Sequence, residues 1–436
     1  MNKYFSQYRL PALMVFIIAL LGGCAVSSIF TSYPAQINTV KTNIDNKQFK
    51  PAREQLAKDT DGADKILYLM EKGRTEQISN NTKSSIQDYS LAMEVIEANE
   101  EKARITLSGA GAQAASLMTN DNAIPYEGES YEQIFLHNFQ AMNYLFAKNI
   151  DAAAVEVRRA NEKQTIALRE HEDEVDKEKE KEKENLEKNK DFMSNFSALD
   201  ATAGKVKNSF QNAYTFYVSG VIYELLDEPN DAYIDYKKAL EIFSDNIYLQ
   251  QDVMRLAKQL SMKDDLSRFS KQFKVEPPLI NQGDGELVIF FEQGFAPPML
   301  EIRLPIITSA GLQKVAFPTY GPNWIITPPL IITDTSGPQL LGNSMPIVNV
   351  QALATKALKE RLPGIMIRQI LRIVAKKEMV KAASKQSTGF ADFLQVVNFV
   401  TEKADLRSWL TLPNDAQIFR TRLKAGEHKL QLNNVT

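Results

Sequence analysis

The spacing of apolar residues changes about two thirds of the way along the chain. From Tyr33 to about Phe273 the chain is rich in Ala, Leu, Glu, Lys, Gln and Asn with few prolines, which predicts helices. From Pro277 onward, prolines separate short β-branched runs. These runs predict strands at 286–291, 299–304 and 311–317. We therefore expect a domain boundary near residues 274–284.

The C-terminal part combines these strands with helices. Helical spacing returns at about 347–386 and 390–404, and strand-like segments follow at 416–423 and 428–432. Ala425-Gly426 between the two last segments predicts a hairpin that closes the chain. We expect an α+β domain over 277–436, with its helices inserted before the last hairpin.

Three helical segments place small and large residues at matching positions. Segment 213–246 has Gly220 and Tyr236, segment 131–164 has Ala141 and Val157, and segment 65–98 has a weaker match that begins at Gly73. A small residue lets two helices cross closely, and this pattern resembles a tetratricopeptide repeat. Gly73 and Ala141 are separated by twice the length of that repeat, which is about 34 residues. A generic helical bundle with Ala and Tyr at helical spacing is the alternative.

These patterns together predict a multidomain protein of α and α+β class. A tetratricopeptide-like all-α domain is expected over 36–276, followed by the β-rich domain with inserted helices. A charged helical insertion is expected at about 165–209, because Glu172 to Lys190 is almost entirely Glu and Lys. This insertion is interpreted as a solvated helix or tether, with a partner-holding extension as the alternative.

The N-terminus is typical of an exported protein. Lys3 and Arg9 precede an apolar stretch too short for a membrane span, and the stretch ends in Leu21-Gly-Gly-Cys24. This ending resembles a bacterial lipobox, which predicts a signal peptide at 1–23, lipidation of Cys24 and a tether at 24–35. A plain signal peptide is the alternative. Because Ala25 is not an Asp, we expect lipid anchoring at the periplasmic face of the outer membrane.

Composition excludes several functional classes. The chain has 51 Lys and Arg against 54 Asp and Glu, so it lacks the basic field of a nucleic-acid binder. A single Cys and three His leave no ligand set for a metal cluster and no intramolecular disulfide. We expect no metal, no cofactor, no nucleic acid and no established catalytic residue. Gly109 to Ala114 only superficially fits a dinucleotide turn.

Two groups of residues are candidates for binding. Polar and aromatic positions on the first helices of the repeats are expected to face a groove that binds protein or peptide partners, and they are Asn138, Asn143, Tyr144, Tyr214, Tyr217 and Tyr223. The loop 122–132 combines aromatics, carboxylates and glycine, and its candidates for ligand contact are Tyr126, Glu127 and Glu129. Some of the groove residues are expected to belong to the core instead.

The lipobox, the hairpin at 131–164, the Tyr126-Glu127-Gly128-Glu129 loop, the Gly285 strand and the Arg407-Ser408-Trp409 ending together resemble a family of Gram-negative tetratricopeptide-repeat outer-membrane lipoproteins. This resemblance implies a role in envelope or cell-wall assembly and brings no catalytic residue. A non-enzymatic scaffold with protein partners is therefore the first hypothesis. The alternatives are an envelope hydrolase centred on loop 122–132, and an accessory of lipid or polysaccharide export suggested by the apolar helix 362–374.

Overall fold

The computed structural model of this protein describes residues 31–57, 62–106, 121–181, 192–273, 283–308, 311–337, 339–384 and 403–434. Cys24 and the glycine-rich segment 109–114 lie outside them. Only residues 403 and 404 of the helix expected at 390–404 are described, and they are not helical. The expected domain boundary falls mostly in the undescribed residues 274–282 and stays a prediction.

The N-terminal part is helical, as the sequence predicted. Its longer helices are α4 (Tyr33–Asp45), α5 (Phe49–Leu56), α6 (Lys65–Ile78), α7 (Thr82–Thr106), α9 (Ser130–Phe146), α10 (Ile150–Lys181), α13 (Ala213–Leu225), α14 (Pro229–Ile242), α15 (Ile247–Gln259) and α16 (Lys263–Gln272). Three short elements accompany them, η2 (Asp121–Ala123), η3 (Met193–Leu199) and α12 (Asp200–Ala203). Helix α10 continues into the charged stretch as far as Lys181, which agrees with the helical insertion.

Consecutive helices pair into hairpins that share one kind of turn. Each turn holds one non-glycine residue with φ between 58° and 60°, and these residues are Lys47, Asn80, Lys148, Asp227 and Ser261. The first two and the last two are each separated by one tetratricopeptide period of about 34 residues, and Asn80 and Lys148 by two periods. Only the separation of Lys148 and Asp227 is irregular, because the charged insertion lies between them. The described helices therefore form five tetratricopeptide-like hairpins, two more than the sequence pattern identified.

Close helix crossing explains why three hairpins were recognisable in the sequence. A Cβ atom added to Gly73 would lie 2.4 Å from the ring of Tyr89, and one added to Gly220 would lie 2.4 Å from the ring of Tyr236. Even the weakest of the three matches is thus a true crossing. The first hairpin has Val40 and Leu56 at the corresponding positions, so its sequence carries no small-to-aromatic signal.

The C-terminal part contains three small antiparallel sheets, with strand orders β1-β7-β6, β2-β3 and β5-β4-β8. Their strands are β1 (Gly285–Gln293), β2 (Leu300–Thr308), β3 (Gly311–Thr319), β4 (Leu330–Asp334), β5 (Gln339–Asn343), β6 (Met345–Asn349), β7 (Asp415–Leu423) and β8 (Leu430–Asn434). The long helix α17 (Val350–Ser384) lies between β6 and β7 in the chain. The three predicted strands and the predicted helix at 347–386 are confirmed.

The predicted closing hairpin is wrong. Both of its strands exist, but β7 pairs with β1 and β6, whereas β8 pairs with β4 in a different sheet. The residues around Gly426 therefore connect two sheets instead of forming a tight turn. Local turn residues could not reveal this, because neither partner of β7 is adjacent in the chain, and β1 lies more than a hundred residues earlier, with Gly285 opposite Leu423.

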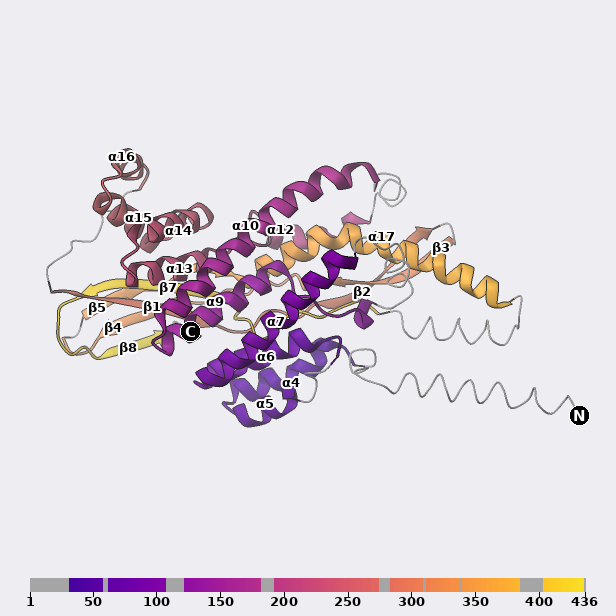
Figure 1. Cartoon of the computed structure of the whole chain (residues 1–436), viewed down its shortest axis with the longest axis horizontal. Coiled ribbons are helices and arrows are strands. Elements are labelled where there is room, and N and C mark those ends of the chain that lie inside the picture. Colours follow the sequence, from indigo (N-terminus) through magenta and orange to yellow (C-terminus); the bar gives the residue numbers. More distant parts are fainter. Residues whose placement is uncertain are drawn as a thin grey trace, which may run out of the picture.

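One buried cluster joins the helical part to the C-terminal part. It includes Tyr89 and Tyr217 from the helices together with Trp409 and Ile418 from the C-terminal part. The ring of Phe290 in β1 lies 6.1 Å from that of Tyr217 in an edge-to-face arrangement. Figure 1 shows β1 and β7 alongside α13, with α17 and the β2–β3 hairpin toward the opposite end of the molecule.

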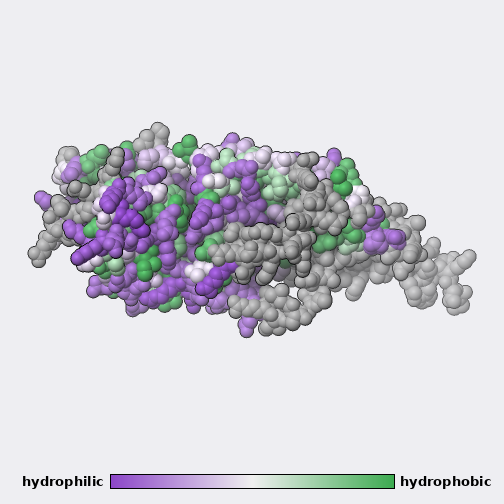
Figure 2. All heavy atoms as spheres, turned by 90° about the horizontal axis from the view of Figure 1, so that it is seen from above, coloured by the Kyte–Doolittle hydropathy of each residue, from purple (hydrophilic) through white to green (hydrophobic). Residues whose placement is uncertain are grey.

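The face of the molecule seen from above is mainly polar among the described residues. Seen from above, hydrophilic side chains predominate, and apolar ones are scattered among them (Figure 2). Within the described residues, no helix is both long enough and apolar enough to cross a membrane. The apolar stripe of α17 packs inward, because Leu362 and Met366 are fully buried.

Candidate functional site

The structure places most of the expected groove residues inside the molecule. Asn138, Asn143, Tyr214 and Tyr217 are fully buried and Tyr223 is nearly so, while Tyr144 is partly exposed. Contact of these residues with a partner stays a prediction. In this structure they contact the protein's own chain.

Their hydrogen bonds show which parts of the chain they contact. Asn143 donates to the Ser85 hydroxyl over 2.8 Å and accepts from Gln77 over 2.9 Å, which links neighbouring hairpins. Tyr214 donates to Glu292 of β1 over 2.7 Å. Tyr214 thus contacts a strand of the C-terminal part of the same chain.

Trp409 lies at the centre of this contact. Its ring is fully buried and meets the rings of Tyr89 (5.9 Å) and Phe139 (5.8 Å) edge to face. Two buried carboxylates hold the backbone beside it. Glu132 of α9 accepts from the Trp409 N–H over 2.7 Å, and Glu71 of α6 accepts from the next two backbone N–H groups over 2.7 and 2.9 Å. No local pattern in the sequence indicated this role for either carboxylate.

The surroundings of each carboxylate shift its pKa. Burial raises the pKa of Glu71, and hydrogen bonds from Thr411, Leu410 and Tyr33 counteract it. Burial, and next the negative charge of Glu129, raise the pKa of Glu132 to about 7. Glu132 also accepts from Tyr126 and from the Glu129 N–H. Both of its oxygens are thus engaged by the chain, and Glu132 connects the two parts across the junction.

The loop before α9 lies at the edge of this junction. The Tyr126 side chain is buried and donates to Glu132. The Glu129 carboxylate forms an ion pair with Arg361 of α17 at 2.5 Å and caps the N-terminus of α9. The Glu127 side chain is exposed. The three loop candidates thus have three different environments, and contact with a ligand stays a prediction for each.

A cavity of about 570 Å³ lies beside this loop. One wall is loop 121–130, and a second is a single face of α17 that carries Arg361, Ile365, Arg368 and Gln369. The remaining lining comes from Met299, Pro318, Ala404, Asp405 and Arg407. The volume is within the usual range for small-molecule sites. All three loop candidates line it, so the sequence located this cavity's edge without locating its other walls.

Arg407 fixes the shape of the cavity wall. It donates to Asp405 through Nε and Nη2, to Asp64 and the Ile124 carbonyl through Nη1, and to the Asp121 carbonyl through Nη2, all within 2.9 Å. These five bonds use every N–H of a guanidinium group. Asp121 is held separately by Arg372 of α17 at 2.5 Å. The loop that lines the cavity is therefore rigidly positioned.

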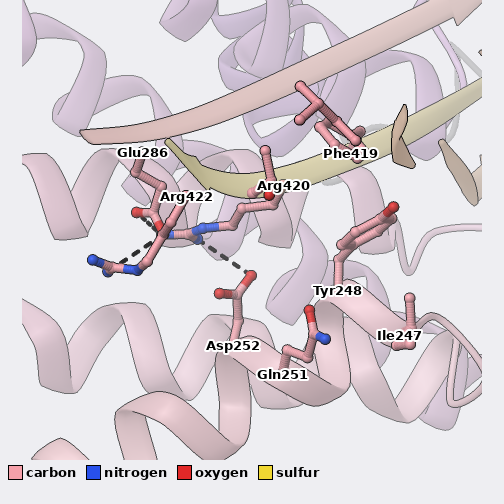
Figure 3. A pocket seen from close by; sticks show the side chains of 10 residues that line it. Ile247, Tyr248, Gln251, Asp252, Glu286, Phe419, Arg420 and Arg422 are labelled. Carbon is pink, nitrogen blue, oxygen red and sulfur yellow. Dashed lines mark hydrogen bonds and ion pairs between the residues drawn. The ribbon is translucent and has the colours of Figure 1, made fainter. Parts of the chain in front are cut away.

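A second, smaller cavity of about 300 Å³ lies between α15 and β7. Figure 3 shows Arg420 extending from β7 between Glu286 and Asp252, with Tyr248 and Phe419 on the other side. Arg420 lies 2.5 Å from Glu286 and 3.2 Å from Asp252. Despite burial, Arg420 and Arg255 lower the pKa of Glu224 to about 2. The charges around this cavity pair with one another, which is typical of a structural network.

The described residues offer little for metal or nucleophilic chemistry. No group of three or more His, Cys, Asp or Glu in the described ranges is arranged to hold a metal ion. His137 is buried and lies 2.7 Å from Glu156. His428 forms a separate pair with Asp334 at 2.6 Å. These two histidines therefore belong to different structural contacts.

No family model matches this chain, and no curated protein matches it. Solved structures overlap it only weakly. A tetratricopeptide repeat protein from Parabacteroides merdae ATCC 43184 is 11% identical over 55% of this chain, with a TM-score of 0.31, and the match spans 65% of that protein's length.

Two further structures give similar results. BtubC (BKLC) from P. vanneervenii is 12% identical over 56% of this chain and 81% of its own, with a TM-score of 0.28. The TPR2AB domain of yeast Sti1, in a complex with pHSP90, is 13% identical over 54% of this chain and 87% of its own, with a TM-score of 0.21. With TM-scores below 0.5, the tetratricopeptide-like description rests on the hairpins' own geometry.

Proposed function

We propose that this protein is a non-catalytic scaffold, lipid-anchored through Cys24 at the periplasmic face of the outer membrane, that binds protein partners during envelope or cell-wall assembly. The observation that carries the scaffold role is the row of five equivalent helical hairpins. Stacked hairpins extend a binding surface without requiring any reactive group. The lipid anchor and the location rest on the lipobox pattern alone.

The partner surface we propose lies at the turn edge of the third and fourth hairpins. Phe146 and Leu225 occupy equivalent positions, two residues before the positive-φ residue of each turn, and are 60% and 61% exposed. Val155 and Ile234 are also equivalent to each other, seven residues after that residue, and are 45% and 49% exposed. Single exposed apolar residues are ordinary, but the same pair repeated on adjacent hairpins forms a candidate contact surface.

Two contacts hold these hairpins together on the same side. Arg158 of α10 pairs with Glu228 at 3.3 Å, and its guanidinium lies 5.8 Å from the centre of the Tyr223 ring. The relative position of the two apolar pairs is thereby fixed. The inner face of the hairpins is less suited to a partner, because Trp409 and β1 already occupy it.

Site-specific photo-crosslinking in cells tests this surface. A photoreactive residue placed at Phe146 or Leu225 of the full-length protein should give the same protein adduct, and Ile234→Asp should weaken the adduct at Leu225. The matched control is Leu340 of β5, which is 62% exposed in a different part of the molecule. Equal adducts at Leu340, or no adduct at either hairpin position, would count against the proposal.

The anchor has its own test. Metabolic labelling with a palmitate analogue should label the wild-type protein, and Cys24→Ser should abolish both the label and sedimentation with the outer membrane. Retention of the label in the variant would exclude Cys24 as its site.

The hydrolase alternative receives less support from the loop geometry. An acid–base pair needs carboxylates that can exchange protons with a bound substrate. Glu132 is buried with both oxygens engaged, and Glu129 is paired with Arg361. The export alternative loses most of its argument, because Leu362, Met366 and Ile370 of the α17 stripe are buried, and Leu371 is the large apolar side chain of the stripe that is exposed (45%).

A further inference from the structure

We propose that the cavity beside loop 121–130 binds a short zwitterionic peptide, with the peptide carboxylate at Arg361 and Arg368 and the peptide ammonium at Glu127. This site is separate from the turn edge proposed for protein partners. It does not depend on the scaffold function.

The cationic side of the cavity has unused binding capacity. Arg361 and Arg368 are seven residues apart on α17, so both project from one helix face into the cavity. Arg361 is 43% exposed and uses Nη1 for Glu129. Arg368 is exposed and forms no ion pair within 4 Å in the described part of the chain. Burial raises the pKa of Glu129, and the charges of Arg361 and of Arg368 counteract it, so Arg368 acts on Glu129 from a distance. A carboxylate can accept two parallel hydrogen bonds from a guanidinium group, which is a strong and directional contact.

The anionic side is a single exposed carboxylate. Glu127 lines the cavity and, among the described residues, has no basic partner. The other carboxylates of the lining are already committed, Asp121 to Arg372, Glu129 to Arg361 and Asp405 to Arg407. Among the described residues, the lining charges without an ion-pair partner are therefore Arg368 and Glu127, on different walls. This arrangement favours a ligand that carries both charges at its two ends over a simple anion.

The rest of the lining suits the middle of a peptide. Ile124, Pro125, Met299, Pro318 and Ile365 supply apolar surface between the charged groups. A site for a small ligand commonly combines apolar walls with a few fixed polar groups. The rigid loop, held by Arg407, reduces the ordering that binding would require.

Calorimetric titration of the full-length protein with the peptide Ala-Leu-Ala tests the proposal. The free peptide should bind, and both its C-terminal amide and its N-acetyl form should bind at least about tenfold more weakly, since each loses a charge-assisted contact. Arg368→Gln should lower the affinity for the free peptide to the affinity that the wild type has for the peptide amide. Glu127→Gln should bind the free and acetylated peptides equally.

The controls separate ligand contact from folding. Lys377→Gln, on an exposed part of α17 away from the cavity lining, should bind as the wild type does. Thermal unfolding of each variant should match the wild type, because neither Arg368 nor Glu127 holds the fold. Unchanged affinity for the amide, full affinity in Arg368→Gln, or no binding of Ala-Leu-Ala at millimolar concentration would overturn the proposal. Binding of inorganic phosphate with the same affinity as Ala-Leu-Ala would also overturn the proposal.

Discussion

Carboxylates only a few residues apart meet two very different surroundings at the N-terminus of α9. Glu132 is sealed inside the junction with Trp409, and both of its oxygens accept hydrogen bonds from the chain. Glu127 faces the neighbouring cavity and has no basic partner among the described residues, whereas Glu129, at the edge of the same cavity, pairs with Arg361 of α17. The difference shows that residue type alone does not separate a carboxylate enclosed by the chain from one that faces a cavity. What separates them is whether the chain itself supplies the donors.

Removing the ring at the closed junction should have the largest effect. Trp409→Ala deletes a fully buried ring that contacts Tyr89 and Phe139, and we expect a loss of about 3–5 kcal/mol in the free energy of unfolding. Urea unfolding followed by circular dichroism measures it. Trp324→Ala is the control, because Trp324 is only partly buried beneath Lys205 and should cost much less. If Trp409→Ala lost no more stability than Trp324→Ala, the buried ring at the junction would not contribute specially to the stability of the fold.

Changing Arg407, in the wall shared by the junction and the cavity, should have the next largest effect on stability. Arg407→Gln leaves Asp64 and Asp405 without their buried cation, and we expect a loss of about 3 kcal/mol. The same unfolding measurement applies. A loss below about 1 kcal/mol would show that the five hydrogen bonds of Arg407 are not needed to hold the loop.

The closed junction should also make the free energy of unfolding depend on pH. Because burial and Glu129 raise the pKa of Glu132 from 4.5 to about 7, the folded state keeps a proton that the unfolded state releases between these values. The free energy of unfolding should therefore fall as pH rises from about 4.5 to 7. The expected contribution of Glu132 is on the order of 1–3 kcal/mol.

Comparison of variants at about pH 5 and pH 7 isolates this contribution. Glu132→Gln has no proton to exchange, so its stability should change less between the two values than that of the wild type. Glu127→Gln, at an exposed position, should retain the wild-type change. An unchanged slope in Glu132→Gln would assign the pH dependence to another group.

Changing Arg361, in the wall of the open cavity, should have the smallest effect on stability. Arg361→Gln breaks the ion pair with Glu129, but the Arg361 side chain is substantially exposed, so we expect a loss below about 1 kcal/mol. Denaturation in parallel with Arg407→Gln provides the comparison. A loss as large as that of Arg407→Gln would show that the cavity arginine is structural and would remove the distinction between the two regions.

The sequence predicted the parts of the fold that local patterns encode. Gly73 and Gly220 identified hairpins because the aromatic rings of Tyr89 and Tyr236 need the space that a Cβ atom would fill. The first and last hairpins lacked that pair and were found only through the φ angles of Lys47 and Ser261. Their turns lie one repeat period from the neighbouring turns, but no distinctive residue marked that spacing in the sequence.

Contacts between distant segments could not be predicted in this way. Loop 122–132 was singled out by its composition, and it does line a cavity, but Arg361, Arg368 and Arg407 lie more than two hundred residues further along. The pairing of Trp409 with Glu132, and of β7 with β1, joins segments with no local sign of each other. These contacts depend on the packed arrangement of the whole chain.

The central position of β7 has a consequence for how the molecule is made. The chain is synthesised from its N-terminus, so the helical hairpins, β1 and β6 are made first. Trp409 and β7 are made only near the end of synthesis. Until then the inner face of the hairpins and the facing edges of β1 and β6 lack their partners, and exposed surfaces of this kind favour aggregation. Such long-range pairing also slows folding. A truncation that removes the residues from 405 onward should therefore leave the helical part prone to self-association and dependent on chaperones.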